Sequence, residues 1–386
     1  MSAQPFLLLM CSMPMRYDAV IIGAGPAGSS AARLLAQAGW NVALVEKTEF
    51  PRRKVCGEFI SATTMPVLKA CGVAASFIAA AGPQVTRVGA YAGNSMLEAP
   101  EEKFWGRALG REHLDLMLRD AAVKVGATLF QPTEVTDFWR QDDDLVCVLE
   151  DGREIAARLV IAACGSWNSK GVFAVPGDDA TPSDLFAFKA HFTGSALPPG
   201  LMPLLAFPGG YGGLVHSDSG RTSLSCCIRR DALGRARGRH GGRAGEAVLA
   251  HIKETTKGAR LALGDAVLDG NFLSTGPIHP GIRERHEDGV FFTGNIAGEA
   301  HPVIAEGISM AIQSSGLLAK LLIAHRGETY AREWKRRFAP RIRAASVFAH
   351  LAMNGTGRLA GRAILSAAPR LLGLGARLSG KAPFAA

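Results

Sequence analysis

Residues 17–46 read YDAVIIGAGPAGSSAARLLAQAGWNVALVE, and this stretch decides the fold. A short apolar run over 17–22 has the composition of a β-strand, and a helical stretch over 29–38 follows the glycine-rich turn. A second apolar strand over 41–45 ends at Glu46. A strand, a helix and a strand in this order predict a βαβ unit, and therefore a parallel sheet covered by helices.

The glycine-rich turn has the spacing Gly23-x-Gly25-x-x-Gly28. Glycines at these positions permit a tight turn and let a diphosphate approach backbone N–H groups at the start of the helix, where the helix dipole favours negative charge. Glu46 lies 21 residues past Gly25, where an acidic side chain accepts hydrogen bonds from ribose hydroxyls. The pattern predicts a dinucleotide-binding site.

Length and composition indicate a globular protein of two domains, or one large domain with insertions. The chain has 386 residues, of which 48% are apolar and 20% are charged. Disordered chains have lower hydrophobicity and higher charge density, so this composition excludes them. No apolar run approaches the roughly 18 residues that cross a bilayer, so we expect no membrane-spanning helix.

The net charge of +9 is concentrated at the C-terminal end. No acidic residue follows Glu333, whereas ten lysines and arginines do, so the rest of the chain is nearly neutral. This segment is expected to be a solvated helical tail packed on the rest of the chain. The alternatives are contact with a membrane surface or with an acidic carrier protein. No specific nucleic-acid partner is expected.

The seven cysteines form no CxxC pair, which is typical of reduced thiols in a cytoplasmic protein, with a peripheral membrane position as the alternative. Residues 1–15 are too short in their apolar part for a signal sequence and are expected to be a disordered leader. The ten histidines show no metal-ligand spacing, so no metal site is expected.

The domain organisation predicted from these patterns is discontinuous. The fold class is α/β (α+β mixed), with a Rossmann-like dinucleotide domain, an inserted antiparallel-sheet substrate domain and a helical C-terminal tail. The dinucleotide domain is assigned to 16–80, 108–170 and 276–330. The substrate domain is assigned to 81–107 and 171–275, and the basic helical segment to 331–386.

Four ordered segments resemble one flavoprotein superfamily. They are Gly23–Ala31 (GAGPAGSSA), Phe50–Glu58 (FPRRKVCGE), Gly110–Asp115 (GREHLD), and Gly294–Pro302 (GNIAGEAHP) with Glu306–Ile308. Together they resemble the FAD-dependent proteins of the para-hydroxybenzoate hydroxylase fold, which include group A flavin monooxygenases, geranylgeranyl reductases and flavin halogenases. The resemblance covers most of the first 325 residues and implies FAD as the cofactor.

The resemblance also implies residue roles. Arg111 would contact the ribityl–phosphate part of FAD, and the helix beginning after Glu306 would point at the flavin. The full implied FAD-binding set is Gly23, Gly25, Pro26, Ala27, Gly28, Glu46, Lys47, Arg53, Lys54, Cys56, Gly57, Arg111, Val135, Gly165, Gly294, Asn295, Pro302, Glu306, Gly307 and Ile308. Cys56, Glu299 and His301 are the catalytic candidates. The alternatives are packing for Cys56 and a loop-fixing hydrogen bond for Glu299 and His301.

The chain departs from the superfamily pattern at several places. Asn295 stands where the second FAD motif usually has aspartate, and the Asp-Gly motif of hydroxylases is replaced by Ala163–Trp167 (ACGSW). The halogenase Trp-x-Trp-x-Ile-Pro stretch is missing, which makes halogenation a minor option. The tryptophan that geranylgeranyl reductases carry near the position of Gly213 is missing as well.

The resemblance implies an FAD-dependent oxidoreductase, in first place a monooxygenase with NAD(P)H as electron donor. It would hydroxylate a hydrophobic or aromatic, polyketide-type substrate through a flavin C4a-hydroperoxide, with a carrier-bound or protein-bound substrate such as tryptophan as a further option. Two alternatives stay open. One is an FAD-dependent ene-reductase of the geranylgeranyl reductase type, and the other is an FAD-binding RNA-modification or adaptor protein.

Overall fold

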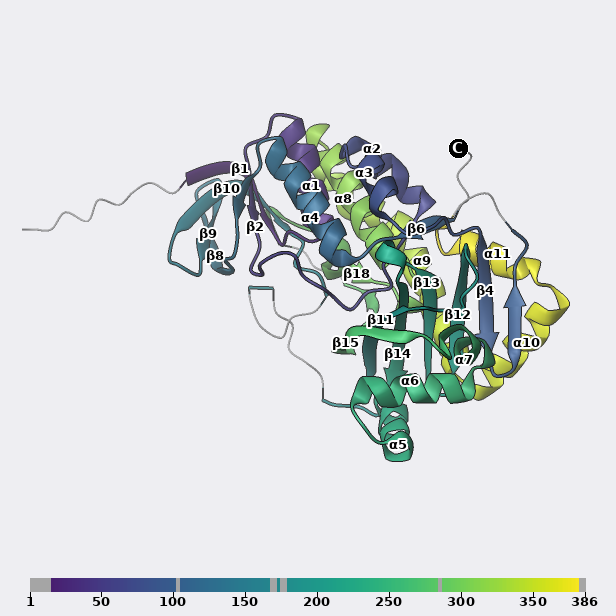
Figure 1. The fold of residues 1–386 in the computed structure, drawn as a ribbon. Coiled ribbons are helices and arrows are strands. Elements are labelled where there is room, and N and C mark those ends of the chain that lie inside the picture. Colours follow the sequence, from purple (N-terminus) through teal and green to yellow (C-terminus); the bar gives the residue numbers. More distant parts are fainter. Residues whose placement is uncertain (1–14, 102–104, 167–171, 174–178, 284–286, 382–386) are drawn as a thin grey trace, which may run out of the picture.

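The computed structural model describes residues 15–101, 105–166, 172–173, 179–283 and 287–381, and contains two large sheets (Figure 1). Nearly all of the expected leader lies outside the described residues. Within the described part of the chain, no helix is long and apolar enough to cross a membrane.

The first sheet is built on the predicted βαβ unit. Its strands lie in the order β7-β2-β1-β10-β9-β8, with β17 beside β10. The strands are β1 (Met15–Ile22), β2 (Val42–Val45), β7 (Thr128–Phe130), β8 (Val135–Gln141), β9 (Asp144–Leu149), β10 (Glu154–Ala162) and β17 (Val290–Phe292). The strands β7, β2, β1, β10 and β17 are parallel, and β9 and β8 extend the sheet as an antiparallel hairpin.

Helices cover the first sheet because its central strands are apolar on both faces. Ala19, Val20 and Ile21 of β1 are fully buried, as expected for a central parallel strand. α1 packs against α4 and α8, and Figure 1 shows the three helices side by side. The helices of this part are α1 (Pro26–Gln37), α2 (Met65–Ala70), α3 (Ala74–Ala80), α4 (Arg111–Lys124) and α8 (Gly307–Ile323).

The second sheet has the strand order β15-β11-β14-β13-β12-β4-β5. The strands are β4 (Arg87–Ala92), β5 (Ser95–Glu98), β11 (Leu185–Thr193), β12 (Leu201–Phe207), β13 (Gly210–His216), β14 (Thr222–Arg229) and β15 (Val267–Ile278). One face is covered by α5 (Arg230–His240), α6 (Ala244–Thr255) and α7 (Lys257–Leu263), as Figure 1 shows. The expected antiparallel sheet needs one correction. β4 and β12 pair in parallel, because β4 enters from a distant segment of the chain.

The strands of each sheet come from separate stretches of sequence. The first sheet uses 15–45, 128–162 and 290–292, and the second uses 87–98, 185–229 and 267–278. The short strands are β3 (Phe59–Ser61), β6 (Gly106–Ala108), β16 (Gly281–Ile282) and β18 (Gly298–Glu299). The domain boundaries given above stay a prediction.

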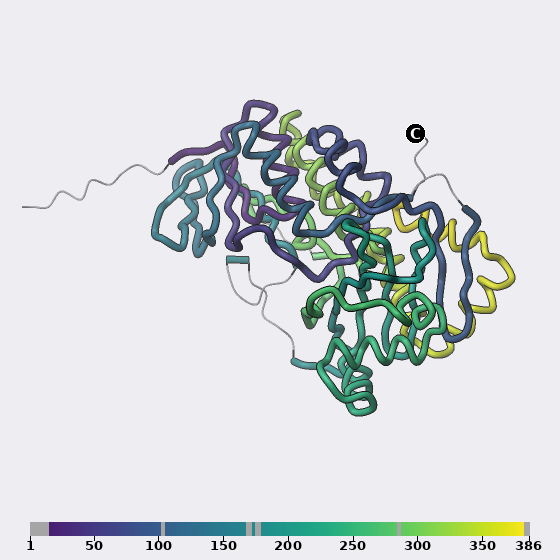
Figure 2. The backbone as a smooth tube through the Cα atoms, in the orientation of Figure 1, coloured from purple at the N-terminus to yellow at the C-terminus, as the bar shows by residue number. Residues whose placement is uncertain are grey.

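The C-terminal segment is helical, as expected, and returns to the body of the protein. It forms α9 (Tyr330–Met353), α10 (Gly355–Ala367) and α11 (Arg370–Leu378). Trp334, Phe338 and Ile342 of α9 belong to the main core, so this helix is an integral part of the fold. Figure 2 shows the segment running back along the edge of the second sheet, where α11 contacts β4 and α10 contacts β5.

Candidate functional site

A large cavity lies between the two sheets. Its volume is about 600 Å³, and it extends from the β1–α1 turn to the strands β12, β13 and β14 of the second sheet. A cavity that runs from a dinucleotide-type turn to a second sheet can bring a bound cofactor into contact with a substrate on that sheet.

The β1–α1 turn leaves room for a ligand at Gly25 and none at Gly28. A Cβ added at Gly28 would lie 1.8 Å from the Gly23 carbonyl oxygen, whereas a Cβ at Gly25 would meet only arginine side chains, at 3.7 Å or more. Gly25 caps α1, and no acidic residue stands in the first turn of that helix. The free N–H groups of α1 therefore face a space suited to an anion.

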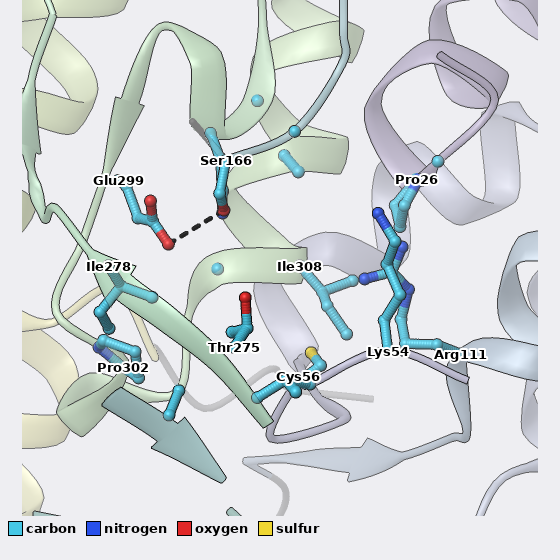
Figure 3. A pocket seen from close by; sticks show the side chains of 18 of the residues that line it. Pro26, Lys54, Cys56, Arg111, Ser166, Thr275, Ile278, Glu299, Pro302 and Ile308 are labelled. Atoms are coloured by element: carbon cyan, nitrogen blue, oxygen red, sulfur yellow. Dashed lines mark hydrogen bonds between the residues drawn. The ribbon is translucent and has the colours of Figure 1, made fainter. Parts of the chain in front are cut away.

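Three cations gather at this end of the cavity. Arg111 and Arg52 lie within 4 Å of the position of a Cβ on Gly25, and Lys54 lines the same space. Figure 3 shows Lys54 and Arg111 directed toward Pro26. Arg111 is held by Asp115 through bonds of 2.7 and 2.8 Å. The charges and the glycine cradle fit the diphosphate of a dinucleotide.

The Lys54 ammonium group is open to the cavity but enclosed by protein. This burial, together with the charges of Arg52 and Arg111, lowers the pKa of Lys54 to about 8. A bound diphosphate would stabilise the ammonium form and raise the pKa again.

FAD affinity is therefore expected to fall as the pH rises above about 8. Below that pH Lys54 is already protonated, whereas above it binding must take up a proton, which weakens affinity by up to about tenfold per pH unit. Calorimetric titration of the FAD-free protein with FAD, from about pH 7 to about pH 9.5, measures this slope. Lys54→Met should remove this dependence of FAD affinity on pH. Lys69→Met, which changes an exposed lysine of α2, should preserve it. A wild-type affinity that does not change with pH contradicts the assignment.

Glu46 is positioned by the turn and by Arg52. Its Oε1 accepts hydrogen bonds from Thr48 N at 2.9 Å and from Arg52 at 2.7 Å. Within the described residues, Oε2 accepts a single bond, from Ala24 N at 2.9 Å. This oxygen keeps a lone pair for a ribose hydroxyl, as the sequence predicts.

The opposite end of the cavity has a network around Ser166. Ser166 Oγ donates to Glu299 Oε1 at 3.1 Å, drawn in Figure 3, and accepts from Asn295 Nδ2 at 3.0 Å. Arg283 lies 3.3 Å from the other Glu299 oxygen. Burial raises the pKa of Glu299, although Arg283 and Ser166 oppose the rise. Glu299 can therefore hold a proton nearer neutral pH than an ordinary carboxyl group.

The start of α8 is set by a buried contact with the C-terminal segment. Glu306, the residue before α8, accepts a hydrogen bond from Ser61 Oγ at 3.1 Å, and Lys381 Nζ lies 3.2 Å from its Oε1. Lys381 also donates to the carbonyl of Ile304. Glu306 thus fixes the N-terminus of α8 from behind, while Gly307 lines the cavity.

The second sheet supplies an apolar wall. Residues of several strands line the cavity, with few polar groups among them. The apolar members are Ala187, Met202, Leu204, Leu214, Val215, Leu273 and Ile278. The polar groups of this wall include Ser225, Ser274, Thr275 and the buried Tyr211. Such a surface suits an apolar substrate that one or two hydrogen bonds orient.

His301 lies behind this wall and does not line the cavity. Its Nδ1 is 3.1 Å from the Tyr211 hydroxyl, and its ring packs beside His350. Burial and His350 lower the pKa of His301 to about 4, so the imidazole is neutral at physiological pH. From this position His301 reaches the cavity only through Tyr211, as a positioning residue.

A buried charged cluster, absent from the sequence prediction, links Glu58, the residue before β3, to the second sheet. Glu58, which lines the cavity, contacts Lys189 with one carboxylate oxygen, and the other is 2.9 Å from His191 Nε2 and 3.0 Å from Ser217 Oγ. Burial alone would raise the pKa of Glu58, but His191 and Lys189 outweigh it and lower the pKa to about 2. Arg53 extends the cluster, since its Nη2 lies 2.6 Å from His191 Nδ1.

The structure brings most of the predicted site residues to the cavity. Those that line it are Gly23, Gly25, Pro26, Ala27, Glu46, Lys47, Arg53, Lys54, Cys56, Gly57, Arg111, Val135, Gly165, Gly294, Asn295, Glu299, Pro302, Gly307 and Ile308. Three predicted residues lie outside the cavity lining and contact residues that line it, namely Gly28, Glu306 and His301. Cys56 also contacts the Arg111 guanidinium.

Among the described residues, one group of potential metal ligands does form, away from the cavity. His240, His251 and Glu254 have ligand atoms within 4.8 Å of one another. His251 Nε2 bonds to the Pro208 carbonyl at 3.0 Å, and His240 Nε2 lies 3.3 Å from Glu254. These hydrogen bonds and ion pairs explain why the three side chains lie together without a metal ion. The spacing of the histidines in the sequence does not predict the cluster.

Comparison with known proteins agrees with this geometry. Residues 16–176 match the family described as FAD binding domain. The menaquinone reductase of Mycolicibacterium smegmatis is 31% identical over 163 residues, 41% of this chain and 40% of that protein. Digeranylgeranylglycerophospholipid reductase 2 of Methanopyrus kandleri is 26% identical over 315 residues, 77% of this chain and 74% of that protein. The structure of a flavin-dependent brominase matches with a TM-score of 0.76 and 20% identity, over 96% of this chain and 95% of the brominase.

The chain is thus a flavoprotein with an FAD-binding domain over residues 16–176. Its fold is that of the flavin-dependent brominase, and its four motifs resemble those of the flavoproteins of the para-hydroxybenzoate hydroxylase fold. The match spans about 40% of the length of the menaquinone reductase.

Proposed function

We propose that this chain is an FAD-dependent monooxygenase that hydroxylates an apolar aromatic substrate. The observation that carries the proposal is the continuity of one cavity from the cationic diphosphate end to the apolar wall of the second sheet. A substrate on that wall would lie beside the cofactor in a partly enclosed space, and oxygen chemistry on a reduced flavin requires that water be kept from the reacting atoms.

The residues that line the cavity have separate roles in this reaction. Lys54 and Arg111 hold the diphosphate, and the apolar wall orients the substrate. When bound and reduced, the flavin supplies the electrons that activate O₂. One oxygen atom enters an aromatic C–H bond as a hydroxyl group and the other leaves as water. NAD(P)H supplies a hydride and the solvent a proton. Glu299, with its raised pKa, is placed to exchange that proton.

Reduction of an isoprenoid double bond is the second candidate. Cys56 lines the cavity within the segment that resembles geranylgeranyl reductases, and a thiol there can give a proton to carbon. The relatives named menaquinone reductase and digeranylgeranylglycerophospholipid reductase favour the same chemistry. In this reaction a hydride and a proton add across the double bond, and no oxygen is consumed.

Oxygen uptake measured together with NAD(P)H oxidation tests the proposal. Pentadecylphenol should stimulate both at equal rates and gain one hydroxyl group. Oxidation of NAD(P)H by geranylgeraniol without oxygen uptake would overturn the proposal in favour of reduction. If neither compound stimulates turnover while FAD stays bound, the enzymatic proposal fails and a binding role becomes the better account.

Replacing Cys56 separates the two candidates further. For hydroxylation, Cys56→Ala is expected to keep the rate within about threefold, because no proton passes through the thiol. A proton donor is worth about a hundredfold or more. Initial rates with pentadecylphenol measure the effect, and Cys71→Ala, a thiol outside the cavity lining, is the control. A loss of a hundredfold in Cys56→Ala alone contradicts the first candidate.

A further inference from the structure

The helix α11 exposes an apolar stripe on its outer face. Leu371, Leu374 and Leu378 follow the i, i+3, i+7 spacing of one helix face, and they are 39%, 51% and 64% exposed. On α10, Leu359 and Ile364 are exposed as well. Isolated exposed leucines are ordinary on a protein surface, but a stripe that follows the helical period is not.

The inner face of α11 packs against the wall of the cavity. Leu372 and Ala376 pack, as Ala305 does, against a cluster that includes Met202 and Val215. Met202, Val215 and Ala305 line the cavity. The helix therefore stands between the apolar wall and the exterior, with its outer leucines on the opposite side.

The charged residues of α10 and α11 themselves are all cationic. Arg362, Arg370 and Arg377 are exposed on α10 and α11, and no acidic residue follows Glu333. Arg370 and Arg377 are seven residues apart, so they lie on one flank of the leucine stripe. An apolar face flanked by cations is the pattern of a helix that lies in the interface of an anionic bilayer.

We propose that the α10–α11 surface, made of Leu359, Ile364, Leu371, Leu374 and Leu378 with Arg362, Arg370 and Arg377, docks on an anionic lipid bilayer. Leucines would enter the acyl boundary and arginines would contact lipid phosphates. An acidic protein would satisfy the arginines but would leave the leucine stripe exposed, so the bilayer fits both features. The idea that docking brings an apolar substrate to the cavity rests on the proposed function. The docking itself is independent of the proposed function.

Vesicle co-sedimentation of the FAD-bound protein tests the surface. Phosphatidylcholine vesicles containing phosphatidylglycerol should bind the wild type, and pure phosphatidylcholine vesicles should bind it far less. The variant Leu371→Gln/Leu374→Gln/Leu378→Gln should bind at least about tenfold more weakly. The matched control is Ile78→Gln/Val123→Gln/Leu261→Gln, which changes three exposed apolar side chains on α3, α4 and α7. It should bind like the wild type.

Two further readouts separate the possible failures. Turnover of pentadecylphenol in detergent micelles should be equal in the leucine variant and the wild type, so a loss of docking is distinguished from a loss of the reaction. Equal vesicle binding by wild type and leucine variant overturns the proposal. A wild-type dimer that ignores vesicles and dissociates in the leucine variant also overturns it, because a second copy then covers the stripe.

Discussion

Gly28→Ala is expected to weaken FAD binding strongly and to destabilise the protein. A Cβ at this position would lie 1.8 Å from the Gly23 carbonyl oxygen and 3.2 Å from Ala163 Cβ, so the backbone of the turn must move. Overpacking typically costs about 1–3 kcal/mol, and a contact of 1.8 Å with a backbone atom belongs at the upper end of that range. It also displaces the N–H groups of α1 from the diphosphate, so we expect FAD affinity to fall by about a hundredfold or more.

The flavin absorbance of the purified protein and its urea unfolding curve measure the two effects. Gly25→Ala separates them, because a Cβ there meets only arginine side chains at ordinary contact distances. This variant should fold normally and bind FAD more weakly. Gly238→Ala on α5, where a Cβ meets nothing within 4 Å, should match the wild type in both measurements. Normal flavin content in Gly28→Ala would refute the role assigned to the turn.

Glu58→Gln is expected to lower the free energy of unfolding by about 3 kcal/mol or more. The substitution leaves Lys189 buried beside a neutral amide, and a buried charge without its counter-ion is costly. Adding Lys189→Met to Glu58→Gln should recover part of the loss, since the stranded cation is removed. The control is Glu98→Gln, which breaks a partly exposed pair with Arg87 and should cost less than about 1 kcal/mol.

The effect of Glu58→Gln depends on pH in a defined direction. The pKa of Glu58 lies at about 2 in the folded protein, below its ordinary value of 4.5. The carboxylate therefore stabilises the fold fully above about pH 4.5, and this contribution is lost as the pH falls toward about 2. The difference in unfolding free energy between wild type and Glu58→Gln should shrink over that window. A difference that stays constant with pH would contradict the charged cluster.

The dinucleotide end of the site could be predicted from the sequence because its determinants are local. The turn from Gly23 to Gly28 and the acid at Glu46 belong to one βαβ unit, whose geometry follows from strand and helix periods. Arg111 and Lys54 came from the motif resemblance and line the cavity as expected. Arg52 was not singled out, although it stands next to Arg53, because the sequence does not say which of two adjacent arginines faces the ligand.

The rest of the site depends on contacts between distant segments. Glu58 meets Lys189 and His191 across more than 130 residues of chain, and no local pattern encodes that meeting. His301 is a catalytic candidate in the sequence because it lies within the second FAD motif, with a loop-fixing hydrogen bond as the alternative, and its side chain lies behind the wall beside Tyr211. The direction of a side chain in an irregular loop follows from tertiary packing, which the spacing of residues does not reveal.

A single turnover with isotopically labelled O₂ tests the central claim most directly. The FAD-bound protein would be reduced without oxygen, mixed with pentadecylphenol, exposed to the labelled gas and analysed by mass spectrometry. The proposal predicts one labelled oxygen atom in each molecule of product and the other in water. Reoxidation of the flavin with an unlabelled, unchanged phenol, together with reduction of geranylgeraniol when that compound is supplied without oxygen, would contradict it.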